Sequence, residues 1–416
     1  MPCAAGVEDH LADEVHAITG LTGHDLLSGR GGVVAHASWR DALRINLHSR
    51  LAQRVLVQLS VTDYRNENDL YHAASNVAWE IWFTPQQTFK IDITAQHSPL
   101  KSLNFAALKI KDAVADRFRS KRGERPGVDT TWPAVRIYAH LTPETLTLYI
   151  DTSGEPLFKR GWRTDKGDAP LKETLAAAMI AASGWDGTTP LYDPCCGSGT
   201  IPIEAAQIAC GIAPGLNRRF GFEKLLPFQR HVWQGLLEEA RAAQHAPTAP
   251  VFGSDVAFRM VDFAQRNAER AGVAHAIELR GGDALQRMPP SDTPGVMLLN
   301  PPYGERIAAA GVAGRGREAF VPGALALQRR ESHTHRESPQ TDDGGDFFAQ
   351  LASHWKKNYS GWSAWMLTPD LKLPGKMRLK ESRRVPMWNG PIECRLFRFD
   401  MIKGSLKKPS PDTPAP

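Results

Sequence analysis

The feature that most constrains this chain is an alternation of short apolar runs and helical stretches from residue 190 onward. The expected strands are "PLYD", "PVFGSD", "IELRG" and "GVMLLN", and helical segments such as "TIPIEAAQIACG" and "AFRMVDFAQRNAERAG" lie between them. Consecutive βαβ units predict a doubly wound parallel sheet. The pattern resumes at "DFFAQLASHWKKNYSGW" and "SAWMLTPD". Ligands of such sheets bind outside the carboxyl ends of the strands.

The first loop of this pattern, "DPCCGSGT", lies between an expected strand and an expected helix. Its two glycines permit a tight turn and a close approach of backbone to a ligand. A dinucleotide fingerprint needs a third glycine where this chain has Pro202, and the P-loop lysine is missing. A nucleoside without phosphates fits better, and S-adenosylmethionine is the common one. The candidate cofactor residues of this loop are Asp193, Cys195, Gly197, Ser198 and Gly199.

Two acidic residues follow later strands and are candidates for holding a nucleoside. A ribose needs a carboxylate at the end of the next strand, and Asp255 follows the short run "PVFGS". The usual offset would instead reach Glu223, which has no strand before it, so Asp255 implies an extra helical insertion between about residues 211 and 250. Asp283 can accept from an adenine amino group. The alternatives are an N-cap at Asp255 and a simple turn residue at Asp283.

The stretch "NPPYGER" ends the expected strand 296–299 in a stiff corner. Methyl transfer from a sulfonium needs a nucleophilic nitrogen held in line and no metal. The exocyclic amine of a base is a poor nucleophile, and two hydrogen-bond acceptors on its N–H groups improve it. Asn300 can offer a side-chain carbonyl and Pro301 a backbone carbonyl. Pro301 and Pro302 stiffen the loop, and Tyr303 can stack on a flipped base. As an isolated tetrapeptide the stretch would be only a turn.

The first 165 residues predict a separate mixed α/β region. Residues 54–62, 135–142 and 145–154 have the pattern of strands, and 104–121 and 170–185 have the pattern of helices. In the helix at 104–121 we interpret four apolar residues as one face, opposite the cations: Phe105, Leu108, Val114 and Phe118.

The positive charge is clustered. The formal net charge is only +5, but residues 109–125 hold seven Lys and Arg against three acids, and residues 372–408 hold eleven against three. Each cluster alone is typical of a solvated face, whereas two clusters favour a polyanionic partner. The candidate RNA-binding residues are Lys109, Lys111, Arg117, Arg119, Lys121, Arg122 and Arg125.

Composition argues against several classes of protein. The chain is 42% hydrophobic and 23% charged, and no apolar run approaches the ~20 residues that span a bilayer. The first twenty residues contain no Lys or Arg, unlike a secretory signal. The five cysteines form no Cys-x-x-Cys pair, which disfavours a zinc site or a disulfide framework. We expect a cytoplasmic protein with reduced thiols and neither a metal nor a membrane partner.

These motifs resemble those of a known family. "DPCCGSGTIPIEAA", "NAERAGV" and "NPPYGER", with "YIDTSGEPLFKRGWR" and "NGPIECRLFRF", are similar to the bacterial 23S rRNA guanine-N2 methyltransferases that carry a THUMP domain. The resemblance implies an N-terminal α+β RNA-binding region of ferredoxin-like and THUMP type. A Rossmann-like methyltransferase domain with a mostly parallel sheet would follow. It also implies S-adenosylmethionine as cofactor, with 23S rRNA or a large-subunit precursor as partner.

By the resemblance, Asp193, Gly197 and Gly199 line the methionine end of the cofactor, Asp255 binds the ribose and Asp283 the adenine. The expected boundaries are a ferredoxin-like subdomain at 1–50, a THUMP domain at 51–165 and a methyltransferase domain at 166–400. Residues 308–343 depart from the family's pattern: they are rich in Ala, Gly, Arg and Ser with little periodicity, which predicts a flexible insertion, and a disordered tail is expected at 401–416. The alternatives are a tRNA guanine-N2 methyltransferase, a non-catalytic RNA-binding assembly factor and a DNA amino-methyltransferase.

Overall fold

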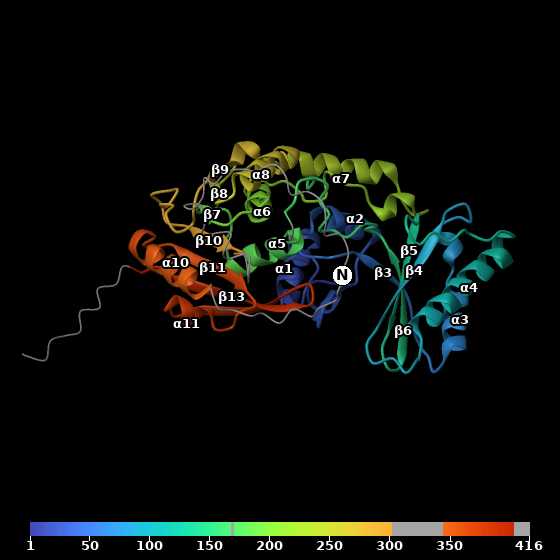
Figure 1. The fold of residues 1–416 in the computed structure, drawn as a ribbon. Coiled ribbons are helices and arrows are strands. Elements are labelled where there is room, and N and C mark those ends of the chain that lie inside the picture. Colours follow the sequence, from blue (N-terminus) through green and yellow to red (C-terminus); the bar gives the residue numbers. More distant parts are fainter. Residues whose placement is uncertain (168–169, 302–343, 403–416) are drawn as a thin grey trace, which may run out of the picture.

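The computed structural model describes residues 1–167, 170–301 and 344–402. In these residues the chain forms a two-stranded, a four-stranded and a seven-stranded sheet (Figure 1). The four-stranded sheet lies at one end of the molecule and the seven-stranded sheet at the other. None of the described helices is long and apolar enough to cross a membrane.

The N-terminal part consists of two helices and a short hairpin. Its elements are α1 (Glu8–Thr19), η1 (Gly23–Asp25), β1 (Leu26–Gly29), β2 (Gly32–Ala35) and α2 (Trp39–His48). The Ser38 hydroxyl accepts from the Asp41 N–H and Asp41 accepts from the Ser38 N–H, so a capping box fixes the start of α2. The buried apolar residues of both helices belong to the same core as Leu191 and Val251 of the seven-stranded sheet.

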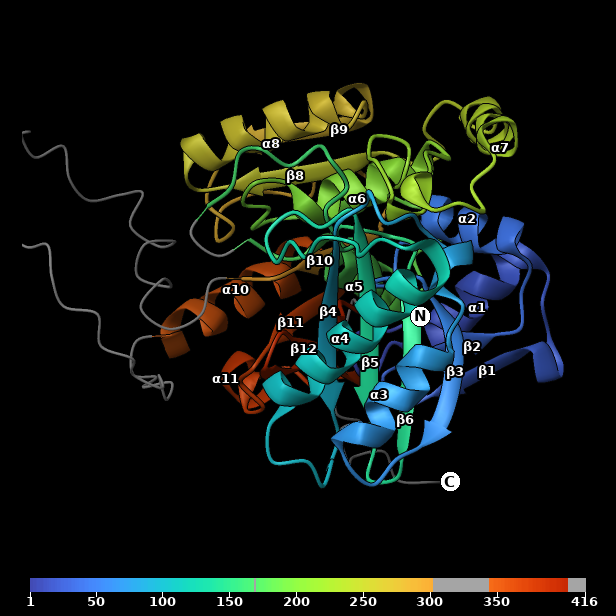
Figure 2. The same ribbon diagram turned by 90° about the vertical axis from the view of Figure 1, so that its right-hand side faces the viewer.

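The four-stranded sheet has the order β3-β6-β5-β4, with β4 and β5 parallel and the other pairs antiparallel. Its strands are β3 (Leu56–Asp63), β4 (Phe89–Ala95), β5 (Val135–Leu141) and β6 (Thr145–Asp151). Figure 2 shows two helices in front of this sheet, α3 (Glu67–Asn76) and α4 (Leu103–Arg122), and the short η2 (Trp79–Ile81) contacts α4. The strands expected at 54–62, 135–142 and 145–154 are confirmed, whereas β4 was not foreseen.

The helix expected at 104–121 is present as α4, but its predicted apolar face is wrong. Val114 and Phe118 are buried, whereas Phe105 and Leu108 are 47% and 51% exposed. Nine positions separate Phe105 from Val114, and at ~100° per residue this places them on opposite sides of the helix. The buried face instead comprises Ala106, Ile110, Ala113, Val114 and Phe118.

The seven-stranded sheet has the order β12-β13-β11-β10-β7-β8-β9. Strands β7 to β11 are parallel to one another. Strands β13 and β12 are added antiparallel at one edge of the sheet. The strands are β7 (Leu191–Asp193), β8 (Val251–Asp255), β9 (Ile277–Gly281), β10 (Val296–Leu299), β11 (Ser363–Thr368), β12 (Arg383–Asn389) and β13 (Ile392–Asp400). The chain therefore runs outward in both directions from β7, as a doubly wound sheet requires.

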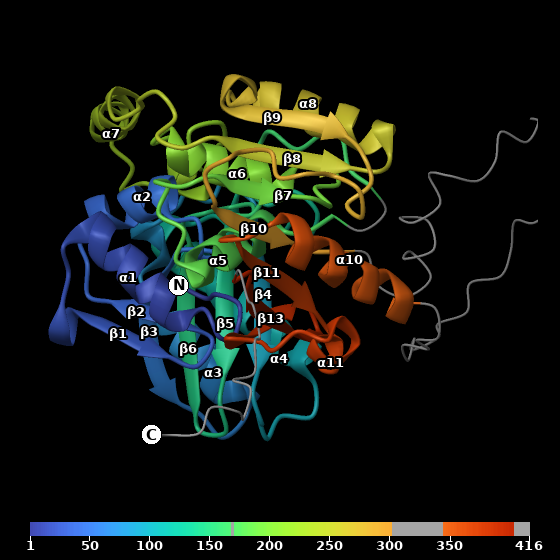
Figure 3. The ribbon, with the colours of Figure 1, turned by 90° about the vertical axis from the view of Figure 1, so that its left-hand side faces the viewer.

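Helices cover both faces of this sheet (Figure 3). Alternate strand residues such as Leu191, Val251 and Leu298 pack into the core that α5 (Glu173–Ser183), α6 (Thr200–Ala209) and α8 (Phe258–Arg270) share. Their neighbours Tyr192, Met297 and Leu299 pack with α10 (Gly344–Asn358) and α11 (Leu373–Met377). The predicted parallel sheet with helices on both faces is confirmed. The remaining described elements are η3 (Gly221–Lys224), α7 (Arg230–Ala242) and η4 (Ala274–Ala276).

Two boundary predictions can be compared with the structure. The helical insertion expected between about 211 and 250 is confirmed, because α7 lies there. The predicted start of the disordered tail at residue 401 is too early, because Met401 is packed into the fold. Met401 is 3% exposed, and its N–H donates to the Trp362 carbonyl over 2.9 Å. The predicted insertion at 308–343 and residues 403–416 lie outside the described residues.

Candidate active site

The candidate site lies at the ends of β7 and β10. These two strands are parallel neighbours, and the sheet continues from each of them toward a different edge. β7 ends at Asp193 and β10 at Leu299, and the register pairs Tyr192 with Met297. From β7 the sheet continues through β8 to β9, and from β10 it continues to β11. This is the switch point at which doubly wound sheets bind ligands. The glycine loop therefore leaves the sheet beside the strand that leads to Asn300.

The loop between β7 and α6 is held in one shape by backbone contacts. Gly197 and Gly199 have φ angles of +53° and +88°, which side-chain-bearing residues rarely adopt. A Cβ on Gly199 would lie 2.9 Å from the Cβ of Ala264, because the loop packs closely on α8, whereas a Cβ on Gly197 would meet open space. The Cys196 N–H donates to the Ser254 carbonyl over 2.9 Å. Gly197 thus has open space beside its backbone.

Two carboxylates flank this loop, the buried Asp193 and the half-buried Asp255. Asp193 is 2% exposed and accepts from the Cys195 N–H over 2.9 Å. Asp255 accepts from the N–H groups of Gly197 and Ala257 over 3.0 and 2.9 Å. Burial raises the pKa of both carboxyls, and the nearby Asp255 raises that of Asp193 further. Among the described residues no Lys, Arg or His forms an ion pair with either one.

The alternative interpretation of Asp255 as an N-cap is not what the structure shows, because the N-cap of α8 is Ala257. The carboxylate nevertheless caps the turn that leads into the helix. Asp283 accepts from the Leu285 N–H over 2.9 Å, so it has the turn contact that its alternative interpretation requires. The ribose-binding role of Asp255 and the adenine-binding role of Asp283 remain predictions.

Cys195 links the three acids in space. Burial raises the pKa of its thiol well above the usual value, and Asp193, Asp255 and Asp283 all raise it further. The three predicted strand-end acids therefore lie around one point of the glycine loop. Cys196 has a pKa raised by the same burial. Neither thiol is suited to act as a nucleophile, because the thiolate is the reactive form.

The Asn300 corner is described in part. Asn300 follows β10 directly and is half-buried, and Pro301 is buried. Pro302 and Tyr303, the other two candidate catalytic residues, lie outside the described residues. Asp193 thus ends β7, and Asn300 follows the end of the adjacent strand β10.

One aromatic residue of the site was not predicted from the sequence. Phe258, the first residue of α8, is 79% exposed, yet its ring lies over Gly281 at the end of β9. A Cβ on Gly281 would come within 2.4 Å of that ring. An aromatic residue three positions after a strand-end acid is the signal that could have identified it. Phe258 offers an exposed apolar surface between the strands that precede Asp255 and Asp283.

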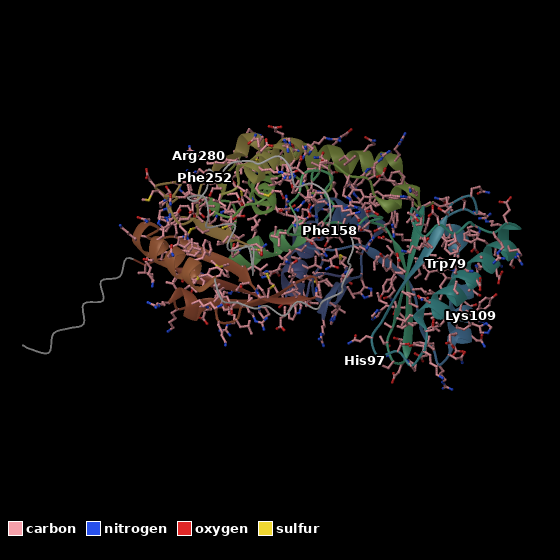
Figure 4. All side chains as sticks on the ribbon, in the orientation of Figure 1. Trp79, His97, Lys109, Phe158, Phe252 and Arg280 are labelled. Carbon is pink, nitrogen blue, oxygen red and sulfur yellow. The ribbon has the colours of Figure 1, made fainter. Side chains whose placement is uncertain are left out.

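A cavity of about 410 Å³ lies close to this edge but does not contain the predicted residues. It is lined by Tyr192 and Phe252, which face away from the α6 layer, and by Arg280 and the segment 286–290. Figure 4 shows Phe252 and Arg280 close together at this end of the molecule, with Lys109 at the opposite end. The described residues contain no cluster of His, Cys, Asp or Glu able to hold a metal ion.

The candidate RNA-binding cations of α4 differ in their contacts. Arg119, Lys121 and Arg122 are exposed in the last turn. By contrast, the Arg117 guanidinium donates to both carboxylate oxygens of Glu80, over 2.6 and 3.0 Å, and its side chain is 18% exposed. The prediction that Arg117 binds RNA is not supported, because its donors are used within the fold.

The remaining cations have weaker contacts. Lys109 lies 5.5 Å from the centre of the exposed Phe105 ring, Lys111 pairs with Asp112 over 2.7 Å, and Arg125 lies 3.6 Å from Asp116. Exposed ion pairs of this kind contribute little and can be exchanged for phosphate. Sequence reasoning also missed Trp132, which is 77% exposed in the loop between α4 and β5.

The Trp132 loop is ordered by its own contacts. The Asp129 carboxylate accepts from the N–H groups of Thr131 and Trp132, each over 2.9 Å. The Phe89 N–H donates to the Gly127 carbonyl and the Asp129 N–H to the Phe89 carbonyl. A tryptophan on an ordered loop that follows a cationic helix end can stack on an unpaired base.

Three family models match successive parts of the chain. They are described as an RlmL ferredoxin-like domain (residues 1–56), a THUMP domain (residues 64–151) and an RMKL-like methyltransferase domain (residues 160–320).

The chain is also similar to named proteins. A Shewanella baltica protein called "Ribosomal RNA large subunit methyltransferase K/L" is 36% identical over 415 residues, which is 98% of this chain and 54% of that protein. The chain spans about half the length of the curated relatives it matches.

Solved structures share the fold over nearly the whole chain. The methyltransferase SMU.472, in complex with SAH, is 26% identical with a TM-score of 0.80, covering 97% of this chain and 98% of that one. A Listeria monocytogenes protein named "a predicted N6-adenine-specific DNA methylase" is 26% identical with a TM-score of 0.78, covering 96% and 94%.

Proposed function

The chain belongs to the methyltransferases that join an RlmL-type ferredoxin-like domain and a THUMP domain to an RMKL-like catalytic domain, and on this premise we propose that it methylates the exocyclic N2 amine of a guanine in 23S rRNA. The proposed methyl donor is S-adenosylmethionine. The observation that carries the proposal is the position of Asp193. This buried carboxylate pairs with no cation among the described residues, and it ends β7, which is paired with β10, the strand that Asn300 follows.

The residues around the glycine loop fit this cofactor. Asp193 and Asp255 are acceptors without a cationic partner among the described residues, and a ligand with an ammonium, a sulfonium and ribose hydroxyls supplies what they lack. The open space over Gly197 admits a ligand close to the backbone. We assign the methionine end to Asp193 and the loop Cys195–Gly199, the ribose to Asp255, and the adenine to Asp283 with the Phe258 ring against it.

The cofactor supplies an electrophilic methyl group on a positively charged sulfur. The protein holds the acceptor nitrogen in line with it. In the proposal the Asn300 side-chain carbonyl and the Pro301 backbone carbonyl accept the two N–H bonds of the guanine amine, which localises the nitrogen lone pair for attack. Pro302 stiffens the corner and Tyr303 stacks on the base. A paired base reaches such a pocket only when it is flipped out of its helix.

The N-terminal half supplies the affinity for RNA in this proposal. Arg119, Lys121 and Arg122 face solvent and neutralise phosphates, Lys109, Lys111 and Arg125 contribute more weakly, and Trp132 stacks on an unpaired base. Figure 4 places Lys109 at the opposite end of the molecule from Phe252. An RNA that contacts α4 and presents a base to Asn300 must therefore span most of the molecule. A large folded rRNA region meets this demand.

The substrate is tested by methylation of three nucleic acids with labelled S-adenosylmethionine. Large-subunit rRNA from cells lacking this protein, total tRNA and duplex DNA are compared, and the modified nucleoside is identified by mass spectrometry. The proposal predicts N2-methylguanosine in the rRNA alone. Labelled tRNA would favour the tRNA alternative, N6-methyladenine in DNA would agree with the Listeria protein's name, and no transfer to any of the three would favour a non-catalytic RNA-binding factor.

A further inference from the structure

The segment from Arg160 to Asp165 leads from the four-stranded sheet into the catalytic domain and crosses directly behind the glycine loop. It contacts both helices that hold this loop. The Arg160 guanidinium is buried and donates to Glu204 of α6 over 3.1 Å, and Asp165 pairs with Arg266 and Arg270 of α8 over 3.1 and 2.6 Å. The linker is therefore packed into the catalytic domain as an integral part of it.

Asn267 of α8 joins this linker to the glycine loop. Its side chain is fully buried, and its amide nitrogen donates to the Ser198 carbonyl over 3.0 Å and to the Asp165 carbonyl over 2.8 Å. Its amide oxygen accepts from the Arg270 guanidinium over 2.6 Å and from the Thr164 and Asp165 N–H groups over 3.3 and 3.4 Å. An amide can serve carbonyls and N–H groups at the same time, which no carboxylate or apolar side chain of this size can do.

Arg163 makes a second connection at the start of α6. Its guanidinium donates to the Thr200 hydroxyl over 2.7 Å, to the Leu171 carbonyl over 2.9 Å and to the buried Glu173 carboxylate over 2.8 Å. Thr200 is the first residue of α6 and follows Gly199, the last glycine of the loop. Ser198 and Thr200 are thus both held from the linker side, on either side of Gly199.

We infer that Asn267 and Arg163 are positioning residues of the cofactor site, and that the linker 160–165 forms the back of that site. The inference rests on the proposed function, because it takes the glycine loop to be the place where S-adenosylmethionine binds. The loop needs a fixed backbone to present N–H and carbonyl groups to a ligand, and Asn267 is the side chain that fixes the Ser198 carbonyl. Because the same amide holds the linker, ligand binding at the loop and the order of the linker are coupled, and the coupling is reciprocal.

The test compares two asparagines of the full-length chain. Asn267→Asp keeps the side-chain shape but places an oxygen against the Ser198 and Asp165 carbonyls. Asn46→Asp is the matched control: Asn46 is 1% exposed, donates to the Ala42 carbonyl and the Thr152 hydroxyl, and accepts from the Ser153 hydroxyl. The affinity for S-adenosylhomocysteine is measured by calorimetry, and hydrogen exchange is measured in peptides covering residues 194–200.

We expect Asn267→Asp to weaken S-adenosylhomocysteine binding about tenfold and to speed exchange in the loop, while Asn46→Asp does neither. Thr200→Val, which removes the acceptor of Arg163, should weaken binding several-fold, and Thr200→Ser should restore it. Unchanged loop exchange in Asn267→Asp would overturn the inference. If the wild-type chain binds no S-adenosylhomocysteine, the proposed function fails, and loop exchange in the two asparagine variants still decides whether Asn267 positions the loop.

Discussion

Asp151 and Asp193 end strands in the two halves of the molecule and have the same local geometry, but only Asp151 has a cationic partner. Each is 2% exposed, and each accepts from the N–H two residues later, from Ser153 over 2.8 Å and from Cys195 over 2.9 Å. Asp151 pairs with Arg54 over 2.5 Å, whereas Asp193 has no cation beside it in the described part of the chain. The same turn thus serves structure in one half and leaves an acceptor for a ligand in the other.

Burial raises the pKa of both carboxyls, but the opposing contributions differ. Arg54 counteracts burial at Asp151, whose pKa is raised to about 6. At Asp193 only one backbone N–H counteracts burial, and the neighbouring Asp255 adds to the rise. A buried carboxylate without a partner destabilises the fold, so we interpret Asp193 as a residue with a role outside folding. The predictions below test this contrast between the two halves.

The largest expected effect is on catalysis at the end of β10. Asn300→Ala should reduce methyl transfer about 1,000-fold, the scale for losing one oriented polar group in a transition state. Binding of S-adenosylhomocysteine should stay within about twofold of wild type, because the proposed cofactor site lies at the ends of β7 and β8. Single-turnover methylation and calorimetry measure the two quantities.

The control for Asn300→Ala is Asn104→Ala, which alters an exposed asparagine of α4. Near-wild-type turnover of Asn300→Ala would remove Asn300 from the mechanism. A comparable loss in Asn104→Ala would show that the assay responds to general damage.

The next largest effect is a difference in the free energy of unfolding between Asp151→Asn and Asp193→Asn. Asp151→Asn leaves the guanidinium of Arg54, whose side chain is 15% exposed, without its carboxylate, and should lower the free energy of unfolding by about 3 kcal/mol. Asp193→Asn removes a buried charge that has no cation and should leave that free energy unchanged or higher. Urea unfolding at pH 7.5 without ligand measures both. Equal destabilisation by the two variants would contradict the contrast.

A smaller effect is expected on RNA affinity. Trp132→Ala should weaken RNA binding about tenfold by loss of a stacking surface, without changing the affinity for S-adenosylhomocysteine. Ile392→Ala, which shortens an apolar side chain that is 52% exposed, is the control. Fluorescence titration with an rRNA fragment gives both affinities. RNA binding as tight in Trp132→Ala as in the control would exclude Trp132 from the interface.

The smallest effect is a pH dependence of thermal stability. The folded-state pKa of Asp193 is raised, so the folded chain loses stability relative to the unfolded chain as pH rises from ~4 through that raised pKa. Asp193→Asn lacks this loss, so its Tm advantage over wild type should grow with pH by a few degrees. Asp151 contributes equally to both proteins. Parallel Tm curves between pH 4 and 8 would contradict the raised pKa.

The catalytic half was largely predictable from the sequence because its signals are local. Strand periodicity, the Gly197 and Gly199 turn, and acids directly after strands depend on neighbouring residues, and the sheet places them at one edge. The helix at 104–121 was also predicted, but its face was not, because two short apolar side chains, Ala106 and Ala113, line the buried side.

What could not be predicted depends on residues that are far apart in the chain. The Glu80 partner of Arg117 lies 37 positions away and the Asp165 partner of Arg270 lies 105 positions away. No periodicity reports such pairs. For the same reason the sequence could not distinguish Asp151 from Asp193, since the Arg54 partner lies 97 positions from Asp151.

We infer that Asp193, the buried acid at the end of β7, serves a ligand rather than the fold. The most direct test of this inference is the affinity for S-adenosylhomocysteine of Asp193→Asn and Asp151→Asn, measured by calorimetry at pH 7.5 and at a temperature where both are folded. We expect Asp193→Asn to bind S-adenosylhomocysteine at least about tenfold more weakly than wild type, and Asp151→Asn to bind it as tightly as wild type. Wild-type affinity in Asp193→Asn, or an equal loss in both variants, would contradict it.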